Sequence, residues 1–199
     1  MESSGSRTGQ IHRQTKETDI NLAFELDGGG QTAIRTGVAF MDHMLTLLAV
    51  HGFFNLSIEG RGDIEVDYHH TVEDLGICLG QALKSALGDF SGISRYGHSL
   101  VPMDESLARV TLDLSNRPYL HYDVLVQDQK VGNFDTALVR EFLWAFALHG
   151  GLTIHVDLLH GQNSHHVLEA AFKALGRALS QACAIEPRTR GPLSSKGTL

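Results

Sequence analysis

A five-residue pattern, His-His-x-x-Glu, occurs twice in this chain and constrains its fold and chemistry more than any other feature. It lies within DYHHTVEDLG in the first half and within NSHHVLEAAF in the second. Imidazole and carboxylate groups are common ligands of catalytic divalent metals such as Mn²⁺, Fe²⁺ and Zn²⁺. The pattern therefore predicts a metal centre, with the candidate ligands His69, His70, Glu73, His165, His166 and Glu169.

Each copy opens an amphipathic stretch that is typical of a helix. Successive residues of an α-helix lie about 100° apart, so two adjacent histidines do not readily face one ion. The glutamate, three and four residues later, returns to the side of both histidines. One copy can thus serve two ions, and two copies are consistent with a two-metal site.

The repeat extends to the segments that precede each copy. AFMDHMLTLLAVHGFFNLSI aligns with TALVREFLWAFALHGGLTIHV, which places His43 opposite Glu141. Internal duplication of this kind predicts two similar half-domains and nominates this pair as further metal ligands. His155, in GLTIHV, competes with Glu141 for that role, although a strand residue that faces a neighbour is the simpler interpretation.

Hydrophobic periodicity predicts an α+β fold, a two-layer sandwich of sheet and helices made of two duplicated half-domains. We place a flexible N-terminus at residues 1–12, half-domains at 13–97 and 98–187, and a substrate-binding tail at 188–199. Strands are expected at residues 20–26, 55–59, 63–67, 107–114, 119–126 and 152–157. Helices are expected at residues 42–50, 71–87, 135–148 and 165–182.

Composition sets limits on the class of protein. A chain of 199 residues forms one compact unit, and its net charge of −7 argues against a nucleic-acid surface. No apolar run approaches the roughly 20 residues of a membrane span, and the N-terminus lacks the apolar core of a secretory signal. Two cysteines in apolar helical patterns provide no disulfide framework, so we expect a cytoplasmic location.

Basic residues are arranged as if for an anion. Arg95 and Arg117 lie in predicted loops, Lys173 follows the second His-His pair, and the tail carries Ser194 and Lys196. Hydroxyl, ammonium and guanidinium groups are donors for a phosphate monoester, although a solvated basic tail accounts for the last segment equally well. Metal and phosphate sites together predict an enzyme acting on a small phosphorylated metabolite. A di-metal hydrolase and a non-catalytic metal-binding shell are the alternatives.

Several segments in the same order resemble the imidazoleglycerol-phosphate dehydratase family. They are FMDHML, DYHHTVEDLGICLGQAL, PMDE, SNRPYL, NSHHVLEAAFKALGRAL and SSKG, and the resemblance runs from about Arg13 to Leu199. It implies conversion of imidazole glycerol phosphate to imidazole acetol phosphate and water in histidine biosynthesis. It also implies two Mn²⁺ ions per active site, with an imidazolate and a diazafulvene-like intermediate, and an octahedral homo-oligomer of 24 subunits with sites between them.

The resemblance assigns roles to individual residues. Many family members have histidine where this chain has Glu141. Glu17 matches a glutamate with an acid/base role at the substrate's glycerol hydroxyl. The implied metal ligands are His43, His69, His70, Glu73, His165, His166 and Glu169, to which the alignment of the halves adds Glu141. Of these, a catalytic role is expected for His43, His70, Glu73, His165 and Glu169. The implied phosphate-binding residues are Arg95, Arg117, Lys173, Ser194 and Lys196.

Sites at helix ends near the surface are often completed by a neighbouring subunit, which independently favours a homo-oligomer.

Overall fold

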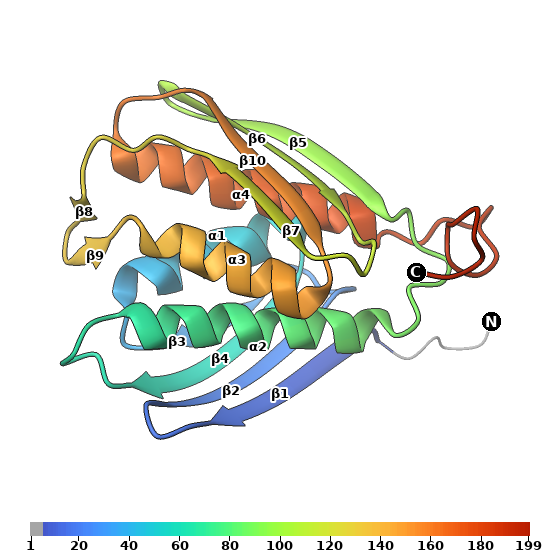
Figure 1. Ribbon diagram of the computed structural model, residues 1–199, viewed down its shortest axis with the longest axis horizontal. Coiled ribbons are helices and arrows are strands. Elements are labelled where there is room, and N and C mark those ends of the chain that lie inside the picture. Colours follow the sequence, from blue (N-terminus) through green and yellow to red (C-terminus); the bar gives the residue numbers. More distant parts are fainter. Residues whose placement is uncertain (1–5) are drawn as a thin grey trace.

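The computed structural model describes residues 6–199, in which two four-stranded sheets enclose a layer of four helices (Figure 1). The first half consists of β1 (Thr8–Gln14), β2 (Thr18–Glu25), β3 (Thr32–Arg35), α1 (Ala39–Gly52), β4 (Asn55–Gly62) and α2 (His69–Leu87). The second half consists of β5 (Tyr96–Met103), β6 (Ser106–Asp113), β7 (Tyr119–Asp123), α3 (Leu138–Gly150), β10 (Thr153–His160) and α4 (Ser164–Cys183). A small hairpin, β8 (Lys130–Val131) and β9 (Phe134–Asp135), lies between β7 and α3.

The two halves repeat one topology. Strand order is β1-β2-β4-β3 in the first sheet and β5-β6-β10-β7 in the second. In each sheet the third strand in sequence pairs in parallel with the last, and all other pairs are antiparallel. Thus β3 corresponds to β7, β4 to β10, α1 to α3 and α2 to α4. This confirms the predicted α+β fold with two duplicated units of sheet and helices.

The two halves share one core. The inward side chains Ile20, Leu22 and Phe24 of β2 are at most 3% exposed, because alternate strand residues face the helix layer. Helix α1 packs against α4, and α2 packs against α3, so each short helix lies on the long helix of the other half. The rings of Phe142 and Phe172 lie 5.7 Å apart where α3 meets α4. Among the described residues, no helix combines the length and apolar character needed to cross a bilayer.

Glycines allow the helix pairs to approach closely. A Cβ at Gly176 of α4 would lie 2.3 Å from the carbonyl oxygen of Leu48 in α1. A Cβ at Gly80 of α2 would lie 2.7 Å from the backbone nitrogen of Gly150 in α3. The two glycines hold equivalent places in the repeat, so both helix pairs depend on the same backbone contact.

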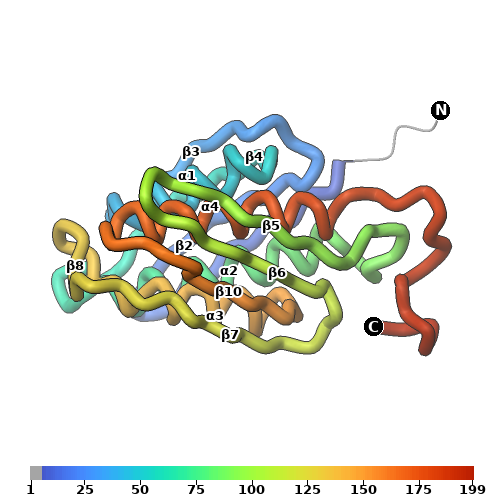
Figure 2. The backbone as a smooth tube through the Cα atoms, turned by 90° about the horizontal axis from the view of Figure 1, so that it is seen from above, coloured from blue at the N-terminus to red at the C-terminus, as the bar shows by residue number. Residues whose placement is uncertain are grey.

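The helices all run in one general direction. Figures 1 and 2 show that α1, α2, α3 and α4 begin at one end of the molecule. The C-terminal segment lies at the opposite end, beside the start of β5. Residues near the helix starts and residues of the tail are therefore separated by the length of the helix layer.

Several expected elements differ from those observed. Residues 63–67, expected to be a strand, form a turn in which the Val66 backbone N–H donates to the Asp63 carbonyl oxygen at 2.8 Å. The chain needs this turn to leave β4 and enter α2. Residues 8–12, assigned above to a flexible start, are part of β1, whereas residues 1–5 of that segment lie outside the described residues. Strands β1, β3, β5, β8 and β9 were not predicted, and the four helices match within a few residues.

Candidate active site

The second His-His-x-x-Glu copy joins α1 in a compact group of ligand atoms. Nitrogen atoms of His43 and His165 and a carboxylate oxygen of Glu169 all lie within 4.8 Å of one another. Oε2 of Glu169 is 3.6 Å from Nε2 of His43 and 3.2 Å from Nε2 of His165. The packing of α1 on α4 therefore brings together three predicted ligands from the two halves, and this group could hold a divalent ion.

Glu169 is ionised although its side chain is buried. It is 8% exposed, and Lys173 Nζ lies 2.6 Å from its Oε1. Burial raises the pKa of the Glu169 carboxyl, but the hydrogen bond and charge of Lys173, together with His43, outweigh burial and hold the pKa below its ordinary value of 4.5. Because Lys173 occupies one carboxylate oxygen, the other is left to the two imidazoles.

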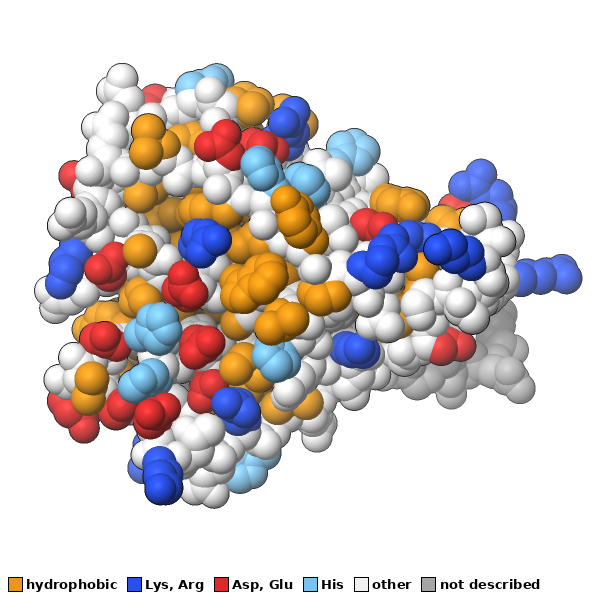
Figure 3. Space-filling model, in the orientation of Figure 1, with side chains coloured by type: hydrophobic (Ala, Val, Ile, Leu, Met, Phe, Trp, Pro, Cys, Tyr) orange, Lys and Arg blue, Asp and Glu red, His pale blue; other side chains and the backbone are white. Residues whose placement is uncertain are grey.

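The first copy forms a more open arrangement with α3. His69 and Glu141 line one cavity of about 510 Å³, together with Asp135 and Lys130 of the β8–β9 hairpin. Glu73 lies one turn further along α2 and is exposed. Within residues 6–199, His69, Glu73 and Glu141 do not converge as tightly as the α1–α4 group does. The space-filling view shows histidine and acidic side chains interspersed where α2 and α3 begin (Figure 3).

The second histidine of each copy points away from the first and toward a carboxylate. The rings of His69 and His70 are inclined by 89°, which agrees with the prediction that adjacent imidazoles face different places. His70 Nδ1 lies 3.0 Å from a carboxylate oxygen of Asp63. That hydrogen bond raises the pKa of His70, with smaller contributions from the charges of Glu17 and Asp63. Since Nδ1 is engaged, Nε2 is the nitrogen left for a metal.

His166 repeats this arrangement in the second half. Its ring is inclined by 85° to that of His165, and its Nδ1 lies 2.7 Å from Oε2 of Glu105. The hydrogen bond raises the pKa of His166 and lowers that of the Glu105 carboxyl. Glu105 also accepts from the backbone N–H of Asn163, the residue that caps α4 by accepting from the His165 N–H. The cap and the carboxylate thus fix the first turn of α4.

Glu17 lies at the same end as these histidines. It follows β1 in the turn before β2, and its Oε2 is 3.9 Å from Nδ1 of His70. Its side chain is 54% exposed, so it is accessible to a bound molecule. The structure therefore brings Glu17 beside a predicted ligand of the first copy.

The basic residues predicted to bind phosphate are divided between two places. Arg95 is buried at the start of β5, where its Nε donates to Asp113 at 2.7 Å and its Nη1 to the Leu193 carbonyl oxygen of the tail at 2.5 Å. Arg117 Nη2 lies 3.7 Å from the same aspartate. Lys173 is instead paired with Glu169 in the α1–α4 group.

Ser194 and Lys196 belong to the tail that Arg95 contacts, at the end opposite the helix starts (Figure 1). The backbone N–H of Lys196 donates to Ser194 Oγ at 3.2 Å, which folds this part of the tail into a turn. One chain therefore does not place the tail beside its own predicted metal ligands.

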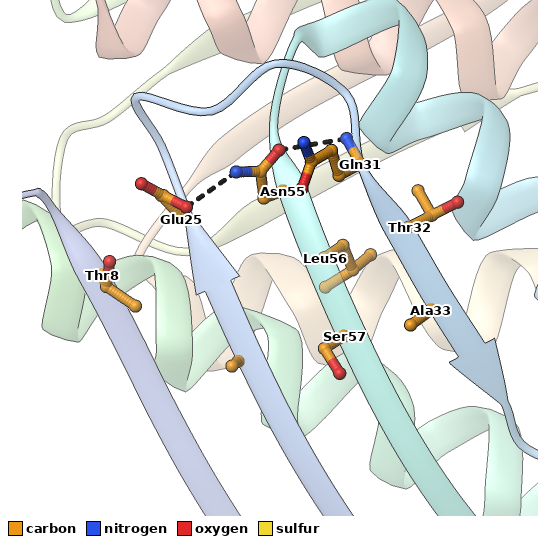
Figure 4. A pocket seen from close by; sticks show the side chains of 9 residues that line it. Thr8, Glu25, Gln31, Thr32, Ala33, Asn55, Leu56 and Ser57 are labelled. Carbon is orange, nitrogen blue, oxygen red and sulfur yellow. Dashed lines mark hydrogen bonds between the residues drawn. The ribbon is translucent and has the colours of Figure 1, made fainter.

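A different pocket on the first sheet lacks these groups. It has a volume of about 370 Å³ and lies across β1, β2, β3 and β4, as Figure 4 shows. Glu25 is the one titratable side chain that lines it, and its Oε2 accepts from Asn55 Nδ2 at 2.7 Å. None of the predicted site residues lines this pocket, so we place the candidate active site at the helix starts.

Asp63 and Glu105 are the site residues that reasoning from the residue pattern missed. Glu105 lies in PMDE, a segment of the family resemblance, and that was the available signal. No sequence signal pointed to Asp63, because residues 63–67 were expected to form a strand. His155, left open above as an alternative to Glu141, does not line the cavity with His69; its ring lies 5.3 Å from that of His121 on the second sheet.

Comparison with known proteins identifies the family. The sequence profile of the imidazoleglycerol-phosphate dehydratase family matches residues 36–179. Imidazoleglycerol-phosphate dehydratase of Syntrophobacter fumaroxidans is 58% identical over 196 residues, which cover 98% of this chain and 100% of that protein. The Bacillus subtilis enzyme of the same name is 58% identical over 193 residues, with coverage of 97% and 100%.

Solved structures agree with the sequence comparisons. The crystal structure of imidazoleglycerol-phosphate dehydratase from Staphylococcus aureus has a TM-score of 0.82 at 43% identity, and the match covers 89% of this chain and 99% of that one. The Pyrococcus furiosus structure has a TM-score of 0.83 at 39% identity, with coverage of 95% and 100%. The chain therefore belongs to the imidazoleglycerol-phosphate dehydratase family, the hydro-lyases of histidine biosynthesis.

Proposed function

We propose that this dehydratase converts imidazole glycerol phosphate to imidazole acetol phosphate with two Mn²⁺ ions in each active site. The observation that carries the proposal is the group formed by His43, His165 and Glu169, with ligand atoms within 4.8 Å of one another. Its mixed nitrogen and oxygen donors, and a glutamate that Lys173 keeps ionised, fit a divalent ion of this kind. The complete ligand set in this proposal is His43, His69, His70, Glu73, Glu141, His165, His166 and Glu169.

The reaction explains why a metal is needed. The hydrogen to be removed is not α to a carbonyl, so abstraction by a side chain alone would be slow. Bound Mn²⁺ would supply a Lewis acid that stabilises negative charge on the substrate's imidazole ring. The chain's own task is to orient the ring, hold the phosphate and move the proton. Asp63 and Glu105 would serve the first task, because they hold His70 and His166 through Nδ1 and leave Nε2 as the nitrogen for a metal. Nε2 of His166 lies 3.8 Å from Asp104 Oδ2, which would have to give way to the ion.

Glu17 is our candidate for proton transfer at the glycerol part of the substrate. Its position 3.9 Å from His70 and its exposure support that role. Replacing Glu17 with glutamine should lower kcat by about 10²- to 10⁴-fold, the usual contribution of general acid–base catalysis, and leave Mn²⁺ binding unchanged. Glu65→Gln is the matched control, because Glu65 lines the same surface depression as Glu17. Full turnover by Glu17→Gln with metal bound would exclude the role.

The phosphate would be held at the other end of the chain. Arg95 and Arg117 offer guanidinium donors, and Ser194 and Lys196 add a hydroxyl and an ammonium group. Arg95 is already fixed by Asp113 and by the tail carbonyl, which supports a preorganised contact. Lys173 lies with Glu169 in the α1–α4 group, away from these residues. There it would neutralise the Glu169 carboxylate, and it would contact the substrate's phosphate only if another subunit brings that group to the helix starts.

The distance between the helix starts and the tail in one chain supports active sites that are completed by a second subunit. The metal ligands lie at the helix starts and the tail lies at the opposite end, so we propose that another copy contributes the phosphate contacts. Exposed apolar side chains such as Val66, Leu125 and Trp144, 42% to 80% exposed, support association. An octahedral assembly of 24 subunits is the proposed form, and a cytoplasmic location remains a prediction.

Subunit complementation tests shared sites. Glu169→Gln damages the helix-start end and Lys196→Ala damages the tail end, so each variant alone should be nearly inactive. Mixed oligomers reassembled from both should regain turnover, because some sites combine two intact ends. Reassembly of each variant with itself is the control. Mixed oligomers as inactive as the controls would show that every site uses one chain only.

The assay should also follow release of inorganic phosphate. The di-metal hydrolase considered from the sequence would release phosphate from the substrate, whereas the dehydratase retains it in the product. We expect product formation without phosphate release.

A further inference from the structure

Two neighbouring strands of the second sheet carry the same His-x-Asp pattern in register. His121 and Asp123 lie on β7, and His155 and Asp157 lie on β10. The parallel pairing sets His121 opposite His155 and Asp123 opposite Asp157. Strand residues two apart share a face, so the four side chains form a square array.

The array faces away from the helices. Ile154 and Val156, which alternate with the array residues on β10, are at most 1% exposed in the core. His155 therefore projects from the outer surface of the sheet, as does His121 on the edge strand β7. Figure 2 views this sheet from outside, with β7 and β10 side by side. The array is thus separate from the ligands at the helix starts.

The spacing suits a metal ion. One ligand atom from each of His121, Asp123 and Asp157 lies within 4.8 Å of the others. His121 Nε2 is 3.6 Å from Asp157 Oδ1. Two ligands about 2.1 Å from a tetrahedral ion lie about 3.4 Å apart, so this pair needs little movement to bind Zn²⁺. The His155 ring lies 5.3 Å from the His121 ring but outside the group of three ligand atoms, so a nitrogen of His155 must move closer to serve as a fourth donor.

Arg109 supports one of the carboxylates. From β6, its Nε donates to Asp157 Oδ2 at 3.1 Å, which leaves Oδ1 directed toward His121. Partners of this kind orient metal ligands in many sites. With both histidines neutral, two carboxylates and one guanidinium leave the array with a net negative charge, which favours a cation.

The duplicated fold provides an internal comparison. The corresponding strands of the first sheet, β3 and β4, are paired in the same parallel register. There the outward positions are Ala33 opposite Ser57 and Arg35 opposite Glu59. The shared topology therefore does not require metal ligands at these positions. The histidines and aspartates of the array occur in the second sheet and not at the equivalent positions of the first.

We propose that His121, Asp123, His155 and Asp157 bind a divalent transition metal, for which Zn²⁺ is the best match, on the outer face of the second sheet. Two imidazoles and two carboxylates are donors that this ion accepts in tetrahedral geometry. The site is independent of the dehydratase centre and lies on a different surface of the chain.

The test compares Zn²⁺ binding by the Mn²⁺-loaded full-length protein and its variants. His121→Gln and Asp123→Asn each remove one exposed ligand. The matched control is His12→Gln, since His12 lies 2.9 Å from Asp19 on the first sheet in an isolated His–Asp pair. Dialysis followed by elemental analysis should show one more Zn²⁺ per chain in the wild type and His12→Gln than in the other two variants. Unchanged dehydratase turnover would verify that all variants fold.

Diffraction at the zinc absorption edge locates the ion directly. Zn²⁺-soaked wild-type crystals should give an anomalous peak between β7 and β10, and His121→Gln crystals should lack it. Equal Zn²⁺ content in all proteins, or anomalous peaks at the helix starts with none between β7 and β10, would overturn the proposal.

Discussion

Replacing Gly176 with alanine should force α1 away from α4 and disturb the ligand group that these helices share. The added Cβ would lie 2.3 Å from the Leu48 carbonyl oxygen and 3.1 Å from the Gly52 backbone nitrogen. Both obstacles are helical backbone, so neither can rotate aside. To bring the new Cβ into ordinary van der Waals contact, α1 and α4 must separate by about 1 Å. Where the helices separate by that distance, the atoms that faced each other lose a quarter to a half of their dispersion energy.

The magnitude follows from two opposed effects. Alanine stabilises a helix by about 1 kcal/mol relative to glycine. Overpacking costs typically about 1–3 kcal/mol, and the upper end applies where backbone must move. We therefore expect a net loss of about 2 kcal/mol, which for a chain of this size corresponds to a fall in Tm of roughly 4–8 °C.

Thermal unfolding of metal-free protein measures this loss. Ser85→Ala, at an exposed position of α2, is the control for helix propensity and should be neutral or slightly stabilising. Gly80→Ala should destabilise less, because its Cβ contacts are 2.7 and 2.8 Å. Gly176→Ala should also weaken Mn²⁺ binding, since His43 is carried by α1. A Gly176→Ala protein as stable as Ser85→Ala would refute the packing argument.

Three further predictions follow from hydrogen bonds and burial. In metal-free protein, Glu105→Gln should lower the free energy of unfolding most between pH 4.5 and pH 6.5, the ordinary pKa values of glutamate and histidine. The lowered pKa of Glu105 contributes stability that is lost in acid, and the raised pKa of His166 contributes stability that is lost as pH rises. A pH-independent effect in urea unfolding would contradict this. Burial raises the pKa of Cys78 and of Cys183 to about 12, so thiol reagents should label them only as fast as the protein unfolds, and rapid labelling of native protein would count against this. Arg95→Lys removes the paired donors to Asp113 and should accelerate tryptic cleavage of the tail; an unchanged cleavage rate would argue against that anchor.

The helices were predictable, and most candidate ligands could be nominated, because their signals are local and repeated. An apolar stripe at helical spacing identifies each helix, and the two His-His-x-x-Glu copies identify each other. The alignment of the halves nominated His43 and Glu141 as further candidate ligands, and the structure brings His43 of the first half within 3.6 Å of Glu169 of the second copy. Duplication thus nominated His43, whereas its proximity to the second copy results from the packing of α1 on α4.

Two edge strands were missed because glycine takes the place of an inward apolar side chain. In β1, a Cβ at Gly9 would lie 1.9 Å from the carbonyl oxygen of Ala82 in α2. In β5, a Cβ at Gly97 would lie 1.8 Å from the carbonyl oxygen of Ala178 in α4. The strand backbone lies directly against a helix, so the alternating hydrophobic pattern that marks a strand is absent.

The partners of His70 and His166 depend on tertiary structure. Asp63 reaches His70 from the turn after β4, and Glu105 reaches His166 from the turn between β5 and β6. No periodicity connects such pairs. The separation of the tail from the candidate metal ligands was likewise not predictable, because it follows from the common direction of the helices.

The dependence of turnover on Mn²⁺ tests the central claim most directly. Protein stripped with a chelator should lose dehydration of imidazole glycerol phosphate and regain it when Mn²⁺ is returned, whereas Glu169→Gln treated in the same way should recover little. Full turnover by the stripped protein, verified as metal-free by elemental analysis, would contradict the proposed metal centre.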